Sequence, residues 1–253
     1  MDNENDKKQS LIYPGERLDD LQRNGYVLIQ DPSLFCFGMD AVLLADFARA
    51  GKKDHVLDLC TGNGVVPVLM AARGKGCFYT GIELQEKSAD LAGRNAVVNG
   101  LGDRFCVIQG DLCGTAGLLK DHDRPEVDVI TCNPPYMAGG DGLVNPGDEK
   151  ALARHEISCT FADIAGQVAN VLKEGGHIYL VHRPRRLVEL VTELKGKKLE
   201  PKRMRFVHSF ADKAATMVLI DAVKGGGSQM IIEPPLVIYG ENGEYTEEVK
   251  LLY

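Results

Sequence analysis

Short apolar runs alternate with helix-like segments from about residue 54 onward, and this pattern constrains the fold more than any other feature of the chain. Buried strands are indicated at residues 55–59, 77–84, 104–109, 127–132 and 176–182. Helical patterns occupy residues 65–73, 85–99, 112–119, 160–173 and 184–194. Because strands that alternate with helices pair in parallel, we predict an α/β protein with helices on both faces of its sheet.

The pattern changes near the carboxyl terminus. Apolar runs at 203–210, 215–223 and 230–238 follow one another with no helical segment between them, which predicts antiparallel strands at one edge. We therefore expect a seven-stranded, mostly parallel sheet with an antiparallel edge. Residues 1–50 form an N-terminal segment ending in a lead-in helix at 39–50, residues 51–253 carry the sheet, and both parts make one compact domain.

Cysteine usage and apolar run length exclude several classes of protein. The seven cysteines include no Cys-x-x-Cys pair, which argues against a disulfide framework or a zinc site and for a reducing compartment. No signal peptide is visible, and no apolar run approaches the roughly 18 residues needed to span a membrane. The sequence thus predicts a cytoplasmic protein without a metal site or a membrane contact.

A glycine-rich loop follows the first predicted strand and contains Asp58, Thr61, Gly62 and Gly64. Glycines let the backbone turn tightly and approach a ligand closely, and the helix that begins here offers unpaired N–H groups. A dinucleotide fingerprint would place a third glycine where Pro67 stands. The loop therefore indicates a ligand site but argues against a nicotinamide-dependent dehydrogenase.

Acidic residues end the next two predicted strands. Glu83 lies 19 residues after Gly64, and a carboxylate at this place can accept both hydroxyls of a ribose. Asp111 follows the third strand, where it can bind an adenine amine. Because the carboxyl ends of parallel strands meet at one edge, these groups predict a site for a nucleoside-containing ligand.

The fourth predicted strand runs into Asn133-Pro134-Pro135-Tyr136, the most specific motif of the chain. An exocyclic amine on an aromatic ring is a poor nucleophile because its lone pair is delocalised into the ring. The Asn133 side-chain oxygen and the Pro134 carbonyl can accept its two N–H groups and direct the lone pair toward an incoming methyl group. Consecutive prolines stiffen this turn, and Tyr136 can stack on a flat substrate.

These motifs together resemble class I methyltransferases, and the Asn-Pro-Pro-Tyr motif resembles the group that methylates adenine, guanine or glutamine amides. The resemblance implies a Rossmann-like fold and S-adenosyl-L-methionine as the cofactor. It implies that Gly62 and Gly64 line the methionine portion, Glu83 holds the ribose, Asp111 contacts the adenine and Asp58 organises the loop. The expected catalytic residues are Asn133, Pro134 and Tyr136.

The segment before the sheet indicates a resemblance to a smaller group within these methyltransferases. Phe37-Gly38-Met39-Asp40 and the residues around it are similar to the N-terminal region of bacterial enzymes that methylate N6 of the adenosine beside the anticodon of tRNA(Val). This similarity places Phe37, Gly38 and Asp40 over the methionine end of the cofactor. It continues through His155-Glu156, in a Gly-containing loop expected to act as a lid, and through residues 181–184. The expected cofactor-binding residues are therefore Phe37, Gly38, Asp40, Asp58, Thr61, Gly62, Gly64, Glu83, Asp111 and Asn133.

Three other functions remain open at this point. Release-factor glutamine N5-methyltransferases share the Asn-Pro-Pro-Tyr motif but have an additional N-terminal helical domain. Guanine-N2 methyltransferases of ribosomal RNA more often have Phe at the place of Tyr136. A non-catalytic RNA-binding module would not need Asn133.

The charge distribution bears on an RNA partner. The net charge is −7, yet residues 173–213 carry 11 positive and 5 negative side chains. Such a segment can be explained as a helix face exposed to solvent. If the substrate is a tRNA, the alternative is that the segment forms a surface that binds phosphates. The candidate residues for this surface are Arg183, Arg185, Arg186, Lys195, Lys197, Lys198, Lys202, Arg203 and Arg205.

Overall fold

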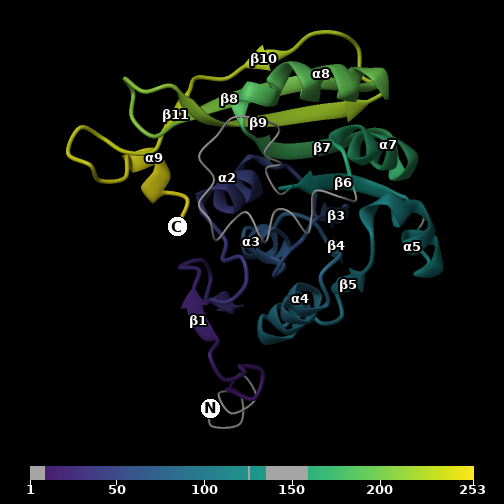
Figure 1. The fold of residues 1–253 in the computed structure, drawn as a ribbon, viewed down its shortest axis with the longest axis vertical. Coiled ribbons are helices and arrows are strands. Elements are labelled where there is room, and N and C mark those ends of the chain that lie inside the picture. The colour runs from purple at the N-terminus through teal and green to yellow at the C-terminus, as the bar shows by residue number, and fades with distance from the viewer. Residues whose placement is uncertain (1–8, 125, 135–158) are drawn as a thin grey trace.

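A computed structural model describes residues 9–124, 126–134 and 159–253 (Figure 1). Its main sheet has the strand order β10-β8-β9-β7-β6-β3-β4-β5, and β11 also pairs with β8. The strands are β3 His55–Leu59, β4 Phe78–Glu83, β5 Phe105–Gln109, β6 Val127–Cys132, β7 Leu172–His182, β8 Leu199–His208, β9 Ala215–Lys224, β10 Ile231–Ile232 and β11 Leu236–Val237.

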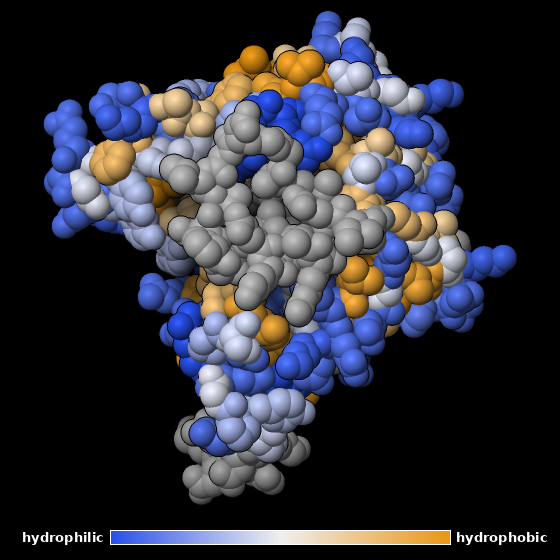
Figure 2. Space-filling view, in the orientation of Figure 1, coloured by the Kyte–Doolittle hydropathy of each residue, from blue (hydrophilic) through white to orange (hydrophobic). Residues whose placement is uncertain are grey.

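The pairing confirms a mostly parallel sheet with an antiparallel edge. Strands β5, β4, β3, β6 and β7 pair in parallel, and β9 lies antiparallel between β7 and β8. Within the described residues the sheet has nine strands, whereas seven were expected. Strands β3 to β9 make up seven, and the run at 230–238, expected to pair antiparallel, forms two further short strands that pair parallel to β8. Pro234 and Pro235 lie between them and cannot donate to a ladder. The isoleucines of β10 are 68% and 61% exposed, and Figure 2 shows apolar surface over this strand.

Helices cover both faces of the sheet, as predicted. On one face α2 (Met39–Phe47) and α3 (Val65–Ala72) pack with Val56 in one apolar cluster. On the other face α5 (Thr115–Asp121), α7 (Phe161–Val171) and α8 (Leu187–Gly196) pack with Leu57 and Leu59. Since side chains along a strand alternate between faces, the consecutive residues of β3 serve both clusters.

The junction between α7 and β7 differs from the prediction. A helix was expected to extend to residue 173, ahead of Gly175-Gly176, but α7 ends at Val171 and β7 begins at Leu172. The two glycines lie within β7, beside a register shift in its pairing with β6. A Cβ atom on Gly176 would lie 2.8 Å from the Asp128 carbonyl oxygen, so this glycine permits the close approach of the two strands.

Both ends of the described chain contain elements that the sequence did not predict. Strands β1 (Arg17–Asp20) and β2 (Val27–Gln30) form an antiparallel hairpin beside α4 (Glu86–Val98). A short helix, α9 (Glu247–Lys250), follows the last strand. Among the described residues, no helix has the length and apolar character needed to cross a membrane.

Candidate functional site

The predicted loop and the first two residues of the Asn-Pro-Pro-Tyr motif, Asn133 and Pro134, meet at the carboxyl edge of the sheet. Leu59, the last residue of β3, pairs with Ile82 of β4 and with Cys132 of β6. The residues that follow these strands therefore emerge side by side. They are the glycine-rich loop after β3, Glu83 at the end of β4, and Asn133 directly after β6.

Asp58 connects the loop to the strand that carries Asn133. Its side chain is 2% exposed and accepts hydrogen bonds from the hydroxyls of Thr61 at 2.7 Å and Thr131 at 2.6 Å. Burial raises the pKa of Asp58 to about 7, the two hydroxyls oppose this rise, and the nearby charge of Glu83 adds to it. Sequence reasoning missed Thr131, although a hydroxyl residue two positions before Asn133 in a buried strand was a usable signal.

Glu83 holds the loop in place through its carboxylate. One oxygen, Oε2, accepts the N–H of Gly62 at 2.9 Å, and Oε1 accepts the N–H of Gln85 at 2.9 Å. The residue is 8% exposed. Each carboxylate oxygen can accept more than one hydrogen bond, so Glu83 retains capacity for a ligand while it orders the loop.

Three glycines allow the backbone turns and the close contacts of the site. Gly62 and Gly64 have φ angles of +56° and +79°, which other residues rarely adopt. A Cβ atom on Gly62 would meet nothing within 4 Å, whereas one on Gly64 would lie 3.0 Å from the Phe105 ring. Gly81 of β4, which the sequence reasoning missed, leaves room for Thr61, since its Cβ would lie 2.8 Å from that side chain.

The residues around the loop fit a ligand with carboxylate and hydroxyl groups. Open space faces Gly62. The side-chain nitrogen of Asn63 is buried, and within the described residues it has no hydrogen-bond partner. A buried donor without a partner is uncommon in folded proteins. Together with the remaining acceptor capacity of Glu83, these features match the amino-acid and ribose parts of a nucleoside cofactor.

Asp111 lies at the same edge, just after β5, and Gln109 of that strand pairs with Glu83. Its carboxylate accepts the N–H of Cys113 at 2.9 Å and caps a short 3-10 helix, η1 (Leu112–Gly114). The side chain is exposed. Asp111 thus orders the turn that would border an adenine ring.

Phe37, Gly38 and Asp40 begin helix α2. Gly38 is its N-cap residue, and Asp40 accepts the N–H of Ala41 at 2.9 Å. Phe37 is partly buried against the apolar cluster that contains α2 and α3. Its N–H donates to the side chain of Gln30 at 3.3 Å, so the end of β2 helps to position this segment.

The catalytic candidates are only partly described. Asn133 is half-buried and Pro134 is buried at the end of β6. The third catalytic candidate, Tyr136, lies outside the described residues together with Pro135, His155-Glu156 and the expected lid loop at 137–158.

The basic residues do not lie together. Arg183, Arg185 and Arg186 follow β7 at the carboxyl edge, the same edge as the glycine-rich loop. Lys195, Lys197 and Lys198 lie at the far end of α8, about 15 Å away for a helix of this length. Arg203 stacks on Phe47 and pairs with acidic side chains, Arg205 pairs with Glu248, and Lys202 donates to the Gly227 carbonyl.

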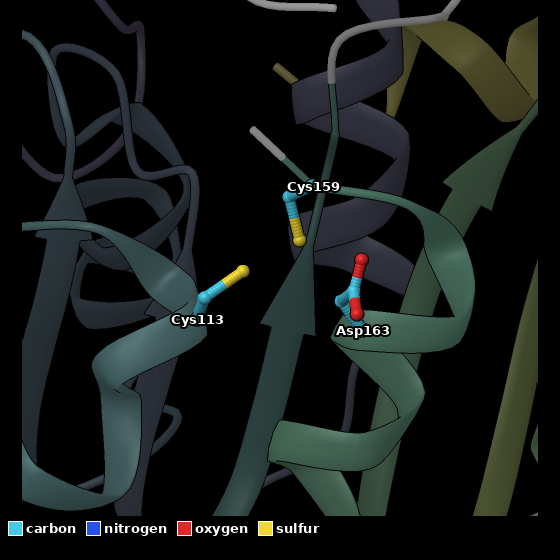
Figure 3. Close-up of side chains that lie close together, drawn as sticks. All are labelled: Cys113, Cys159 and Asp163. Carbon is cyan, nitrogen blue, oxygen red and sulfur yellow. The ribbon is translucent and has the colours of Figure 1, made fainter. Parts of the chain in front are cut away.

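Among the residues that the structure describes, one group of side chains has ligand atoms close enough together to hold a metal ion. Cys113, Cys159 and Asp163 bring two sulfurs and a carboxylate oxygen within 4.8 Å of one another (Figure 3). Three ligands are one fewer than a structural zinc site uses. The Asp163 carboxylate already accepts the N–H and the hydroxyl of Thr160. Burial raises the pKa of both thiols, and Asp163 serves in the capping box of α7.

Comparison with known proteins assigns the family. The profile of the methyltransferase small domain matches residues 28–196. The chain belongs to this methyltransferase family. The match covers the glycine-rich loop, Glu83, Asp111 and the Asn-Pro-Pro-Tyr motif, and it confirms the expected class of enzyme.

Similar curated proteins carry a narrower description. Proteins called tRNA1(Val) (adenine(37)-N6)-methyltransferase from Aeromonas salmonicida and Shewanella sp. are 26% and 28% identical to the chain. Each alignment covers 83% of this chain, and 85% and 86% of the respective relative. The Pedobacter heparinus protein of the same name is 27% identical over 84% of this chain and 87% of its own.

Solved structures confirm the Rossmann-like methyltransferase fold. A predicted O-methyltransferase from Agrobacterium tumefaciens superposes with a TM-score of 0.67 at 23% identity, over 85% of this chain and 95% of that one. A putative methyltransferase complexed with S-adenosylhomocysteine gives a TM-score of 0.55 at 15% identity, over 83% and 57% of the two chains.

Proposed function

We propose that this methyltransferase uses S-adenosyl-L-methionine to methylate N6 of an adenosine in tRNA, the one beside the anticodon of tRNA(Val). The observation that carries the proposal is the placement of Asn133 and Pro134 directly beside the glycine-rich loop. Asp58 connects the two, because it accepts hydrogen bonds from Thr61 in the loop and from Thr131 in β6, the strand that precedes Asn133. The names of the similar curated proteins support the choice of substrate.

The cofactor would lie along the carboxyl edge of the sheet. Gly62 and Gly64 would line its methionine portion, Glu83 would accept the ribose hydroxyls, and Asp111 would border the adenine. Phe37, Gly38 and Asp40 would cover the methionine end. In this arrangement residues 1–50 complete the site of the domain at 51–253.

In this reaction the main role of the protein is to orient the adenine amine. When bound, S-adenosylmethionine supplies an electrophilic methyl group. Asn133, through its side-chain oxygen, and Pro134, through its carbonyl, would accept the two N–H groups of the adenine amine, which directs the nitrogen lone pair toward that methyl. Fixed acceptors need no reorganisation during the reaction, and such positioning contributes much of the rate. Tyr136 would stack on the adenine.

The RNA would approach over the same edge. Arg183, Arg185 and Arg186 would contact phosphates there, since they follow β7 beside the site. A base in a folded tRNA must leave its stack to reach the acceptors of Asn133 and Pro134. A tRNA substrate also agrees with the cytoplasmic location expected from the sequence.

Methyl transfer from labelled S-adenosylmethionine to unmodified bulk tRNA, followed by nucleoside mass spectrometry, tests the proposal. N6-methyladenosine is the expected product, and tRNA(Val) should be the labelled species. Incorporation into ribosomal RNA or a release factor, with none into tRNA, would reject the substrate while keeping methyl transfer to an amine.

A further inference from the structure

Asn95 on α4 is fully buried at 0% exposure and joins two parts of the molecule that are distant in sequence. Its side-chain oxygen accepts the N–H of Ile29 at 2.7 Å. Its nitrogen donates to the carbonyl of Ile29 at 3.0 Å and to the carbonyl of Asn63 at 2.9 Å. One amide group therefore binds both strand β2 and the glycine-rich loop.

Asn99, one helical turn later, repeats half of this arrangement. Its side chain accepts the N–H of Val27 at 2.9 Å and donates to the Val27 carbonyl at 2.7 Å. The two asparagines thus bind alternate residues of β2, as a neighbouring strand would. Asn99 donates its other hydrogen to the backbone of its own helix, at the carbonyl of Asn95, so only Asn95 reaches the loop.

The start of the hairpin is also fixed to α4. Arg94 pairs with Glu16 at 2.6 Å and stacks on the Tyr13 ring with its guanidinium carbon 4.0 Å from the ring centre. At its other end the hairpin leads into Gln30, which accepts the N–H of Phe37. The N-terminal segment therefore contacts α4 at Tyr13, Glu16 and strand β2, and Gln30 at the end of β2 contacts Phe37.

We infer that Asn95 is a positioning residue for the cofactor site, because it joins the Asn63 carbonyl and strand β2 in one hydrogen-bond network. Gly62 and Gly64 lie on either side of Asn63, and glycine has wide conformational freedom, so the bond from Asn95 to the Asn63 carbonyl restrains the middle of this loop. Through β2 and Gln30 the same network reaches the N–H of Phe37, and Phe37 would cover the other side of the cofactor. The inference rests on the proposed assignment of this loop to S-adenosylmethionine.

Asn95→Ala and Asn99→Ala form a matched pair for the test. Both remove the side-chain bonds to one residue of β2, but only Asn95→Ala also frees the loop carbonyl. We expect Asn95→Ala to weaken binding of S-adenosylhomocysteine roughly fivefold to tenfold in calorimetry, as the loss of one buried hydrogen bond implies. Asn99→Ala should bind within about twofold of the unaltered protein at temperatures where both variants are folded.

Hydrogen exchange gives a readout that a general loss of stability would not produce. The amides of residues 62–65 should exchange faster in Asn95→Ala and remain as in the unaltered protein in Asn99→Ala. In the unaltered protein, S-adenosylhomocysteine should slow exchange both in the loop and at residues 27–30. Protection confined to the loop would overturn the inference even if Asn95→Ala did not fold.

A third variant separates this inference from the proposed function. Glu83→Gln should weaken S-adenosylhomocysteine binding if the ribose lies where proposed. Unchanged affinity in Glu83→Gln would reject the placement of the cofactor. Weaker binding in Glu83→Gln, together with equal affinities of the two asparagine variants, would reject the role of Asn95 alone.

Discussion

Asp58 is a buried carboxyl group that orders the glycine-rich loop and has a shifted pKa. Its side chain is buried, its two oxygens accept hydroxyl hydrogen bonds, and Glu83 lies close enough to repel its charge. Burial dominates, so the pKa of Asp58 rises to about 7. The protonated form is consequently much more populated in the folded protein than in the unfolded chain, where the ordinary value is 3.8.

This shift predicts a pH-dependent difference between the unaltered protein and Asp58→Asn. Between about pH 4 and pH 7 the folded protein binds a proton at Asp58 that the unfolded chain has lost, so this contribution to stability decreases as pH rises. The free energy of unfolding, measured in urea, should fall relative to Asp58→Asn by a few kcal/mol across this range and stay level above it. Parallel curves for the two proteins would contradict the shift.

Comparison with the variant is needed because two histidines change the free energy of unfolding with pH in the opposite direction to Asp58. Burial lowers the pKa of His55 and of His182 to about 4. The unfolded chain binds protons at both positions below about pH 6.5, so their contribution to stability increases as pH rises toward that value. These histidines are present in both proteins, and their effect cancels in the difference.

Asn133 is expected to border the cofactor as well as the substrate, but we predict that its main effect is on the substrate amine and that it contributes little to cofactor affinity. Asn133→Ala should reduce the turnover number by roughly 100-fold or more, the usual effect of removing one preorganised polar group. The dissociation constant for S-adenosylmethionine, measured by calorimetry, should change by less than about twofold. Asn133→Asp keeps an acceptor oxygen and should retain part of the rate. Loss of cofactor binding in Asn133→Ala would contradict this division of roles.

Helix α7 illustrates an element whose start the sequence defines well. Thr160 accepts the N–H of Asp163, and Asp163 accepts the N–H of Thr160, which together form a capping box, as their Thr-x-x-Asp spacing allows. Both bonds satisfy backbone groups that a helix start otherwise leaves without partners.

Thr160→Ala should therefore lower the free energy of unfolding by about 1 kcal/mol and the melting temperature by roughly 2–4 °C. Thr192→Ala is the matched control, because Thr192 is exposed in the interior of α8 and alanine favours a helix there. Calorimetric scans of both variants give the comparison. Equal melting temperatures for the two variants would show that the capping box contributes nothing.

Elements with a clear apolar period were predicted from the sequence, and elements held by distant polar contacts were not. The strands from β3 to β6 are short buried runs, so composition alone marks them. Hairpin β1-β2 depends on Asn95, Asn99 and Arg94, which lie about 70 residues farther along the chain, and no local pattern contains that information. The end of α7 was misplaced for a similar reason, since Gly176 serves the contact with β6 and not the helix.

At the scale of the whole molecule, the parallel sheet converts separate motifs into one site. Gly62, Glu83 and Asn133 were predicted as a group because they follow parallel strands, and the register places them together. Thr131 and Gly81 were missed because their roles depend on neighbours across the sheet. The basic segment was predicted as one surface, but α8 separates its members toward opposite edges of the sheet.

That separation predicts which arginines and lysines contact RNA. Arg185→Glu with Arg186→Glu changes charge at the carboxyl edge, whereas Lys197→Glu with Lys198→Glu makes the same change in charge at the far end of α8. The arginine pair should weaken tRNA binding strongly at low salt and reduce the slope of log affinity against log salt by roughly two. The lysine pair should alter affinity only slightly, since screening limits its effect beyond about 10 Å. Filter binding across a salt series measures both, and equal losses would indicate that RNA extends over the whole of α8.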